Sequence, residues 1–341
     1  MGVQVVLTSR RKFLAFLALA ICFTPALVAP DDTVFDGPTT ITCPASRPLC
    51  NGQRCCVAKN GVCCADNEHC CPSGYTCSTG GQCAAKNNAT HKYDAIVPQY
   101  RLCQPDLSLH RLKLSKPSGM YFPYFADSPV DAPSRIRMAV IVIHGAARNP
   151  DVYFCGMREA AVALQEDWPA SDVGVFAPWF MHDVDQPPPG TIQWNGADND
   201  GAWRKGAESM DDGEGTASSF DMLDAMVRSL LDEQLHPLEA LAIVGHSSGG
   251  QTVQRYALTT KVHDIIKERG IPVRFVVSNP SSYAYLSRKR WSDDSESFTD
   301  PLPSAINTCE GYDRWGWGLG APHPPYVAGQ DLTSFAARCA A

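Results

Sequence analysis

The stretch that most constrains the fold is residues 241–250, where an apolar run meets a Gly-x-Ser-x-Gly sequence and then a helical pattern. Its first four residues are continuously apolar, as a strand buried on both faces requires, and the residues after it are rich in helix formers. The turn between strand and helix must be tight, and close approach of the two leaves no room for side chains at Gly245 and Gly249. We therefore predict a strand, a sharp turn at Ser247 and a helix.

Ser247 is the candidate nucleophile of this turn. A serine at such a junction takes a strained backbone conformation, which lifts its hydroxyl above the edge of the sheet. The helix that follows aims its free N–H groups at whatever the oxygen attacks. The alternative is a glycine-rich turn with an incidental serine.

Composition bounds the class of protein. The chain has 341 residues, 44% hydrophobic and 19% charged, which is enough for one α/β domain with a buried core and a small additional module. Its net charge of −7 provides no basic surface, so we do not expect nucleic acid as a partner. Fifteen cysteines indicate an oxidising compartment.

The N-terminus has the layout of a secretory signal peptide, which we place at residues 1–29. Three basic residues precede an apolar stretch that Pro25 interrupts. The stretch is short for a membrane-spanning helix, so we expect no stable span after cleavage; an uncleaved signal anchor is the alternative. Asn88 begins a glycosylation sequon. Together these features predict a secreted glycoprotein.

Residues 43–83 hold ten cysteines with few apolar neighbours, so this segment must be cross-linked rather than held by burial. Adjacent cysteines in an extended chain point to opposite sides, so each of the three Cys-Cys pairs can staple to a strand above and a strand below. A metal site that includes His69 is the competing interpretation, and in a secreted chain we favour disulfides. The cysteines are Cys43, Cys50, Cys55, Cys56, Cys63, Cys64, Cys70, Cys71, Cys77 and Cys83.

The run from Cys63 to Cys77 closely resembles the central stretch of granulin (epithelin) modules. Those modules have twelve cysteines with four adjacent pairs, and this chain departs from that pattern in its first half. The resemblance implies a module at 43–83 for protein interaction or spacing, with a possible protein partner. Residues 84–98 are polar and are predicted to be a linker.

Strand and helix patterns alternate from residue 99 onward. We predict strands at 107–114, 135–143, 173–179, 241–244 and 273–277, and helices from Pro150, at 218–231 and at 251–260. This order implies an α/β fold with a mostly parallel sheet and flanking helices. Residues 99–341 resemble secreted α/β-hydrolases of the esterase, lipase and polyhydroxyalkanoate-depolymerase type.

The resemblance implies a serine hydrolase that cleaves carboxylic esters in a small molecule or polymer, without cofactor or metal. In that pattern the N–H groups of Ser248 and Ala146 form the oxyanion hole. We expect His144 to order its loop by hydrogen bonding, and His246 to be structural with its side chain directed away from the site.

The general base is the gap in this prediction. Downstream of Ser247 only His263, expected in the helix after the turn, and His323 remain. The chain therefore looks cut off before the acid and the histidine of the triad. A compact variant would use His323 with Asp313 or Asp300, and a non-catalytic interaction protein on a hydrolase scaffold is the alternative function.

Two further features leave alternatives open. Aromatic residues in 183–215 and 307–326, including Trp194, Trp203 and Trp317, could line a substrate site or plug the core. The remaining cysteines make two possible bridges whose pairing one sequence cannot give: Cys103, Cys155, Cys309 and Cys339.

Overall fold

A computed structural model of the chain describes segments between residues 48 and 332. They are 48–50, 54–56, 60–66, 69–71, 73, 75–78, 82–85, 96–98, 100–101, 109–132, 134–163, 169–195, 202–211, 213–233, 238–309 and 311–332. The predicted signal peptide, Asn88, Cys103 and Cys339 lie outside these segments. No helix within them is long and apolar enough to span a membrane.

The described residues form two compact units. The first unit contains the described residues before Ser108 and within Phe154–Val173. The second unit contains the described residues within Ser108–Tyr153 and from Gly174 onward.

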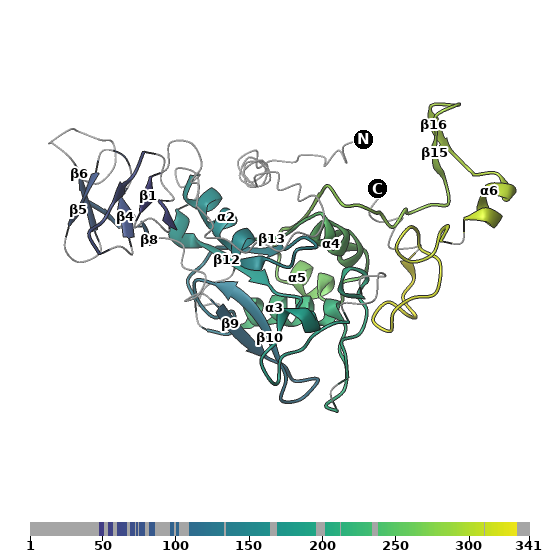
Figure 1. Cartoon of the computed structure of the whole chain (residues 1–341), viewed down its shortest axis with the longest axis horizontal. Helices are drawn as coiled ribbons and strands as arrows, with labels where there is room; N and C mark the ends of the chain where they lie inside the picture. The colour runs from purple at the N-terminus through teal and green to yellow at the C-terminus, as the bar shows by residue number, and fades with distance from the viewer. Residues whose placement is uncertain are drawn as a thin grey trace. The chain divides into compact units, whose positions relative to one another are not determined.

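The cysteine-rich part of the first unit consists of short antiparallel strands (Figure 1). They form three small sheets with the orders β1-β2, β3-β4-β8 and β5-β6-β7. The strands are β1 (Leu49–Cys50), β2 (Arg54–Cys55), β3 (Val62–Cys63), β4 (His69–Cys71), β5 (Tyr75–Ser78), β6 (Gln82–Ala85), β7 (Ile96–Pro98) and β8 (Tyr100–Arg101).

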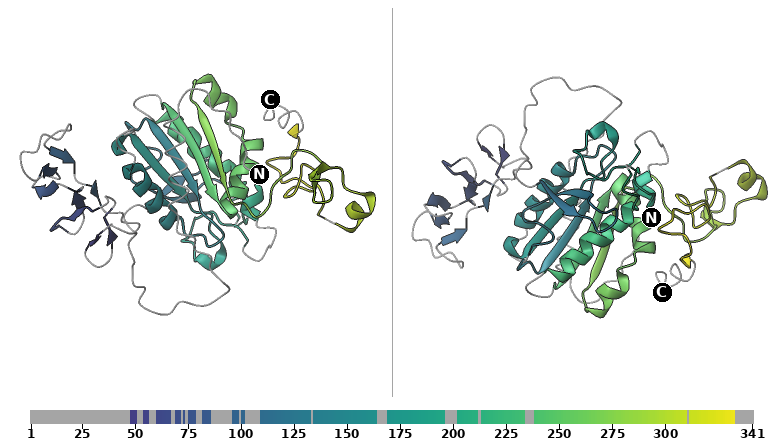
Figure 2. Two further views of the ribbon diagram at one scale, coloured as in Figure 1. Left: turned by 90° about the horizontal axis from the view of Figure 1, so that it is seen from above. Right: turned by 90° about the horizontal axis from the view of Figure 1, so that it is seen from below.

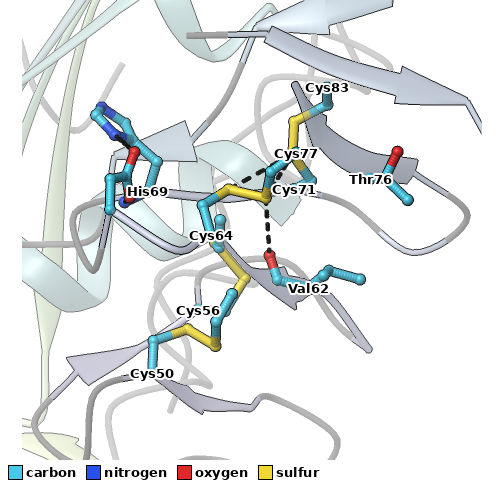
Figure 3. Close-up of a disulfide and its surroundings, with 12 residues drawn as sticks. Cys50, Cys56, Val62, Cys64, His69, Cys71, Thr76, Cys77 and Cys83 are labelled. Carbon is cyan, nitrogen blue, oxygen red and sulfur yellow. Dashed lines mark hydrogen bonds and ion pairs between the residues drawn. A yellow bond between two sulfur atoms is a disulfide. The ribbon is translucent and has the colours of Figure 1, made fainter. Parts of the chain in front are cut away.

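Disulfides join these strands as the adjacent cysteine pairs predict (Figure 3). Cys63 bonds to the earlier Cys50, whereas its neighbour Cys64 bonds to the later Cys77. The next pair repeats the arrangement, with bridges Cys56–Cys70 and Cys71–Cys83. Two adjacent pairs therefore each staple in both directions along the chain, and the predicted ladder is confirmed for them.

The pairing of strands extends past the predicted module boundary at residue 83. Ala84 pairs with Ile96 across β6 and β7, and Cys70 of β4 pairs with Tyr100 of β8. Both ends of the predicted linker at 84–98 therefore lie in strands that pair within this unit. These strands are only two to four residues long, which is too short for an alternating pattern to show in the sequence.

The second unit is built on a six-stranded sheet with the order β14-β13-β11-β12-β10-β9 (Figure 2). β13 pairs in parallel with β11 and with β14, whereas β10 is antiparallel to both β9 and β12. The strands are β9 (Leu109–Lys113), β10 (Tyr121–Ala126), β11 (Met138–Ile143), β12 (Val173–Pro178), β13 (Ala240–His246) and β14 (Val273–Ser278). This mostly parallel sheet with flanking helices confirms the predicted fold class.

The core lies against one face of this sheet. Ile141 of β11 and Ile243 of β13 belong to the same buried cluster as residues of α3 and α4. The two helices touch through Phe220 and Tyr256, whose ring centroids are 5.6 Å apart. The helices are α2 (Pro150–Ala163), α3 (Ser219–Asp232), α4 (Ser248–Thr259), α5 (His263–Glu268) and α6 (Pro303–Thr308).

Short elements complete the second unit. They are the 3-10 helices η3 (Asp183–Asp185) and η4 (Ala202–Lys205) and the hairpin of β15 (Arg290–Ser292) and β16 (Ser297–Thr299). A further 3-10 helix, η2 (Ala170–Asp172), belongs to the first unit.

Two predictions need correction. His263 does not lie in the helix after the turn: α4 ends at Thr259, and the hydroxyl of Thr260 accepts the N–H of Val262 before α5 begins. Cys309 carries a free thiol in an exposed position after α6, so full pairing of the four remaining cysteines is wrong. Cys155 is disulfide-bonded.

Candidate functional site

Ser247 occupies a sharp junction between β13 and α4. Its backbone torsions are φ 55° and ψ −118°, in a region that non-glycine residues rarely adopt. The N–H of Ser247 donates to the carbonyl of Ser278 at the end of β14, at 3.0 Å, which ties the junction to the neighbouring strand. The serine is partly exposed. The strand, turn and helix predicted from the glycine pattern are all present.

The two glycines of the turn are required by close backbone contacts. A Cβ on Gly245 would lie 2.2 Å from the carbonyl oxygen of Gly249, and a Cβ on Gly249 would lie 2.2 Å from that of Ile143. Such distances leave no space for any side chain. The start of α4 is therefore pressed against the end of β11 and the residues that follow it.

The loop after β11 lies beside Ser247. A Cβ on Gly145 would be 3.7 Å from the Cβ of Ser247. The next residue, Ala146, is exposed, and no described residue accepts a hydrogen bond from its N–H. Ser248 is the first residue of α4, so its N–H has no acceptor within the helix. Two backbone donors thus flank Ser247 from separate segments.

His144 orders this loop, as expected from sequence. Its side chain is fully buried; Nδ1 donates to the carbonyl of Gly145 at 2.8 Å, and Nε2 accepts the N–H of Phe180 at 3.1 Å. The rings of Phe180 and Trp203 pack on it with centroids 5.9 and 4.9 Å away. Burial lowers the pKa of His144 to about 4, so the imidazole is neutral and committed at both nitrogens.

His246 contacts Tyr153, with its Nδ1 at 3.2 Å from the tyrosine Oη. Burial raises the pKa of Tyr153, so its hydroxyl stays protonated at neutral pH. This oxygen would also lie 3.0 Å from a Cβ on Gly145. Tyr153 therefore packs where His246 and the loop meet, a contact that no local sequence pattern reveals.

Among the described residues, no histidine is hydrogen-bonded to the Ser247 hydroxyl. His323 donates from Nε2 to the carbonyl of Leu319 at 2.9 Å and packs edge-on against Trp315. The carboxylate of Asp313 lies 3.7 Å from Arg290 and 3.9 Å from Arg288. The contacts of His323 and Asp313 are therefore with groups other than Ser247 and each other.

A buried arginine anchors the segment that leads to His323. Arg255 of α4 is fully buried and donates to the hydroxyl of Ser282 at 2.8 Å and to the carbonyl of Gly316 at 2.6 Å. Burial lowers the pKa of Arg255 to about 10. The helix that follows Ser247 therefore also holds the chain around residue 316.

Most aromatic residues of the two insertions are part of the core. Trp194 and Trp203 are fully buried, and Trp315 is nearly so, whereas Trp317 is exposed. Of the two roles that the sequence allowed, lining a substrate site or filling the core, these three buried tryptophans fill the core.

The cysteine-rich unit brings three sulfur atoms, of Cys64, Cys71 and Cys77, within 4.8 Å of one another (Figure 3). Each belongs to a disulfide, so none can act as a thiolate ligand. The Nδ1 atom of His69 is hydrogen-bonded to the Asp66 carboxylate at 2.8 Å. The disulfide interpretation of this segment is confirmed over the metal one.

The solved structures that resemble this chain include three hydrolases. A poly(3-hydroxybutyrate) depolymerase from Bordetella parapertussis is 16% identical, with a TM-score of 0.30 over 45% of this chain and 48% of that one. Poly(aspartic acid) hydrolase-1 from Sphingomonas sp. KT-1 is 16% identical, with a TM-score of 0.30 over 67% and 81%. Esterase B from Lactobacillus rhamnosis is 13% identical, with a TM-score of 0.22 over 52% and 48%.

The chain thus spans about half the length of the first and third of these structures. No curated protein matches the chain. One family model does match: residues 41–84, which contain the disulfide ladder, are a granulin module.

Proposed function

We propose that the second unit is a serine hydrolase that cleaves carboxylic esters, with Ser247 as the nucleophile. The observation that carries this proposal is the strained, partly exposed serine at the junction of β13 and α4, where nearby backbone contacts require glycine on both sides. A strained residue held by its surroundings is typical of a functional site.

In this proposal the Ser247 oxygen attacks the ester carbonyl and the alcohol leaves, giving an acyl-enzyme that water then hydrolyses. The N–H groups of Ser248 and Ala146 stabilise the negative oxygen of each tetrahedral intermediate. One such donor typically contributes a factor of about 10² to 10³ in rate. The substrate would be an ester-bearing small molecule or polymer.

The proton of Ser247 needs a base, and His323 is the base candidate that we carry from the sequence. To act as the base, His323 would have to leave the Leu319 carbonyl and carry its proton on Nδ1, so that Nε2 could accept the proton of the serine hydroxyl. His323→Asn tests this role: an unchanged rate would exclude His323 as the base.

The deciding experiment measures hydrolysis of short-chain p-nitrophenyl esters by the full chain and by Ser247→Ala. We expect the variant to lose at least a factor of about 10³ in kcat. Ser295→Ala, an exposed serine in the β15–β16 turn, should keep the full rate. Equal rates for wild type and Ser247→Ala would remove the assignment and favour an interaction protein.

The granulin module supports a second proposal, that the protein is secreted. Disulfides persist in oxidising compartments, and this module depends on them. We also propose that the module carries any protein-partner binding. Detection of the chain in the culture medium, with the sequon at Asn88 glycosylated, would test secretion.

A further inference from the structure

Arg148 and Asp185 form a bidentate ion pair next to the loop that follows β11. The guanidinium Nε lies 2.6 Å from Oδ2 of Asp185, and its Nη2 donates to Oδ1 at 3.1 Å. The side chains are only 20% and 14% exposed. A fork-to-fork pair with this little exposure fixes the relative position of its two backbones more strictly than a surface pair does.

The pair joins the segments that follow two neighbouring strands. Arg148 lies in the loop between β11 and α2, and Asp185 lies in η3, after β12. Asp185 is itself held, because its Oδ2 also accepts the N–H of His182 at 2.7 Å. Arg148 has a left-handed backbone with φ 51°, which a non-glycine residue keeps only when its surroundings hold it there.

Arg148 donates hydrogen bonds to two carbonyls of the loop, those of Gly145 and Ala146, which lie before and after the Ala146 N–H in the chain. Its Nη1 donates to the carbonyl of Ala146 at 3.2 Å, and its backbone N–H donates to the carbonyl of Gly145 at 3.2 Å, which His144 also holds. The Gly145 carbonyl and the Ala146 N–H share one planar trans peptide and point in opposite directions. Fixing the carbonyl therefore fixes the direction of the N–H.

We propose that Arg148 and Asp185 are positioning residues, which aim the Ala146 N–H at the oxyanion formed on Ser247. This inference rests on the proposed hydrolase function. Neither side chain needs to touch substrate. Their contribution is made in the transition state, where the donor must already point at the developing charge.

The chain offers a control pair at the opposite end of β11. Arg137 and Glu239, which directly precede β11 and β13, form a second bidentate pair at 2.7 and 2.9 Å. Asp185→Asn and Glu239→Gln each remove one charge from such a pair and preserve side-chain shape. Only the first pair borders the loop next to Ser247.

The test measures ester hydrolysis and amide hydrogen exchange of the full chain. For Asp185→Asn we expect kcat to fall roughly tenfold to a hundredfold with KM little changed, as for a weakened oxyanion donor. Arg148→Lys, which keeps the charge but not the fork, should lose less than Arg148→Ala. Glu239→Gln should keep wild-type kcat.

Hydrogen exchange separates this inference from the proposed function. In Asp185→Asn, and also in that variant combined with Ser247→Ala, the Arg148 amide, which donates to the Gly145 carbonyl, should exchange at least tenfold faster, whereas Glu239→Gln should leave it unchanged. If wild type shows no hydrolysis that depends on Ser247, the proposed function fails, and with it the positioning of an oxyanion donor. Unchanged exchange in Asp185→Asn would overturn the inference, as would faster exchange with unchanged kcat.

Discussion

Ser247 and Arg148 are two non-glycine residues with left-handed backbones in the same small region. Their φ angles are 55° and 51°. Each costs on the order of 1–3 kcal/mol and persists only because neighbours hold it. Ser247 is held by the carbonyl of Ser278, and Arg148 by Gly145 and Asp185. Stored strain on both segments supports a working site here rather than an incidental turn.

The buried His144 makes a testable prediction about pH. Its pKa falls from 6.5 to about 4, chiefly because burial disfavours the charged ring. Below pH 6.5 the unfolded chain therefore binds a proton that the folded protein binds only near pH 4. The free energy of unfolding should fall as the pH drops across this window, by roughly 3 kcal/mol from this residue.

Chemical denaturation of wild type and His144→Asn between pH 4 and 7 checks this. The variant cannot titrate at this position, so its free energy of unfolding should depend less steeply on pH. His182, whose pKa burial also lowers, remains in both proteins and acts as a common background. Identical slopes would show that His144 is not the buried neutral group described here.

At the scale of elements, the contact between α4 and β11 makes Gly249 indispensable. An alanine there would press its Cβ against the Ile143 carbonyl, so Gly249→Ala should lower the free energy of unfolding by more than about 2 kcal/mol. Gly156→Ala is the control, because nothing lies within 4 Å of its added Cβ in α2. It should stabilise the protein by up to about 1 kcal/mol. Equal effects in urea denaturation would contradict the close contact.

Asp224 links α3, α4 and the segment that contains Tyr326. Its buried carboxylate accepts hydrogen bonds from the hydroxyls of Tyr256 at 2.7 Å, Tyr326 at 2.8 Å and Thr260 at 3.2 Å. Asp224→Ala would leave buried hydroxyls without a partner, so we expect a loss of about 3 kcal/mol in the free energy of unfolding. Tyr326→Phe, which removes one of these bonds, should lose less. A smaller loss in Asp224→Ala than in Tyr326→Phe would refute this network.

Local chemistry explains which elements the sequence could predict. The turn at Ser247 could be predicted because close backbone contacts there require glycine, and the glycines are visible in the sequence. β10 was missed because Pro123 interrupts its pattern. The strand tolerates this proline beside Arg111 of β9, and the Pro123 carbonyl accepts the N–H of Trp179. The ion pair of Arg148 was missed because its partner is 37 residues away.

At the scale of the whole molecule, two different forces stabilise the two units. The second unit has a large buried apolar cluster around its sheet. The cysteine-rich part of the first has a small one, of Cys64, Cys71 and Cys83, with Tyr75 and Cys77 against it. Disulfides must therefore supply there what burial supplies in the sheet.

This division predicts that loss of one disulfide stays local. Replacing both Cys71 and Cys83 by serine opens a loop closed across 12 residues, which should cost the cysteine-rich part about 3 kcal/mol. Hydrogen exchange should therefore rise in 60–85 and stay at the wild-type level in β11 and β13. Ser297→Ala in the second unit is the control for substitution itself. If exchange in β11 and β13 rose as much as in 60–85, the sheet would depend on the bridge. A core stabilised by its own buried apolar residues should not change its exchange rate when the bridge is lost.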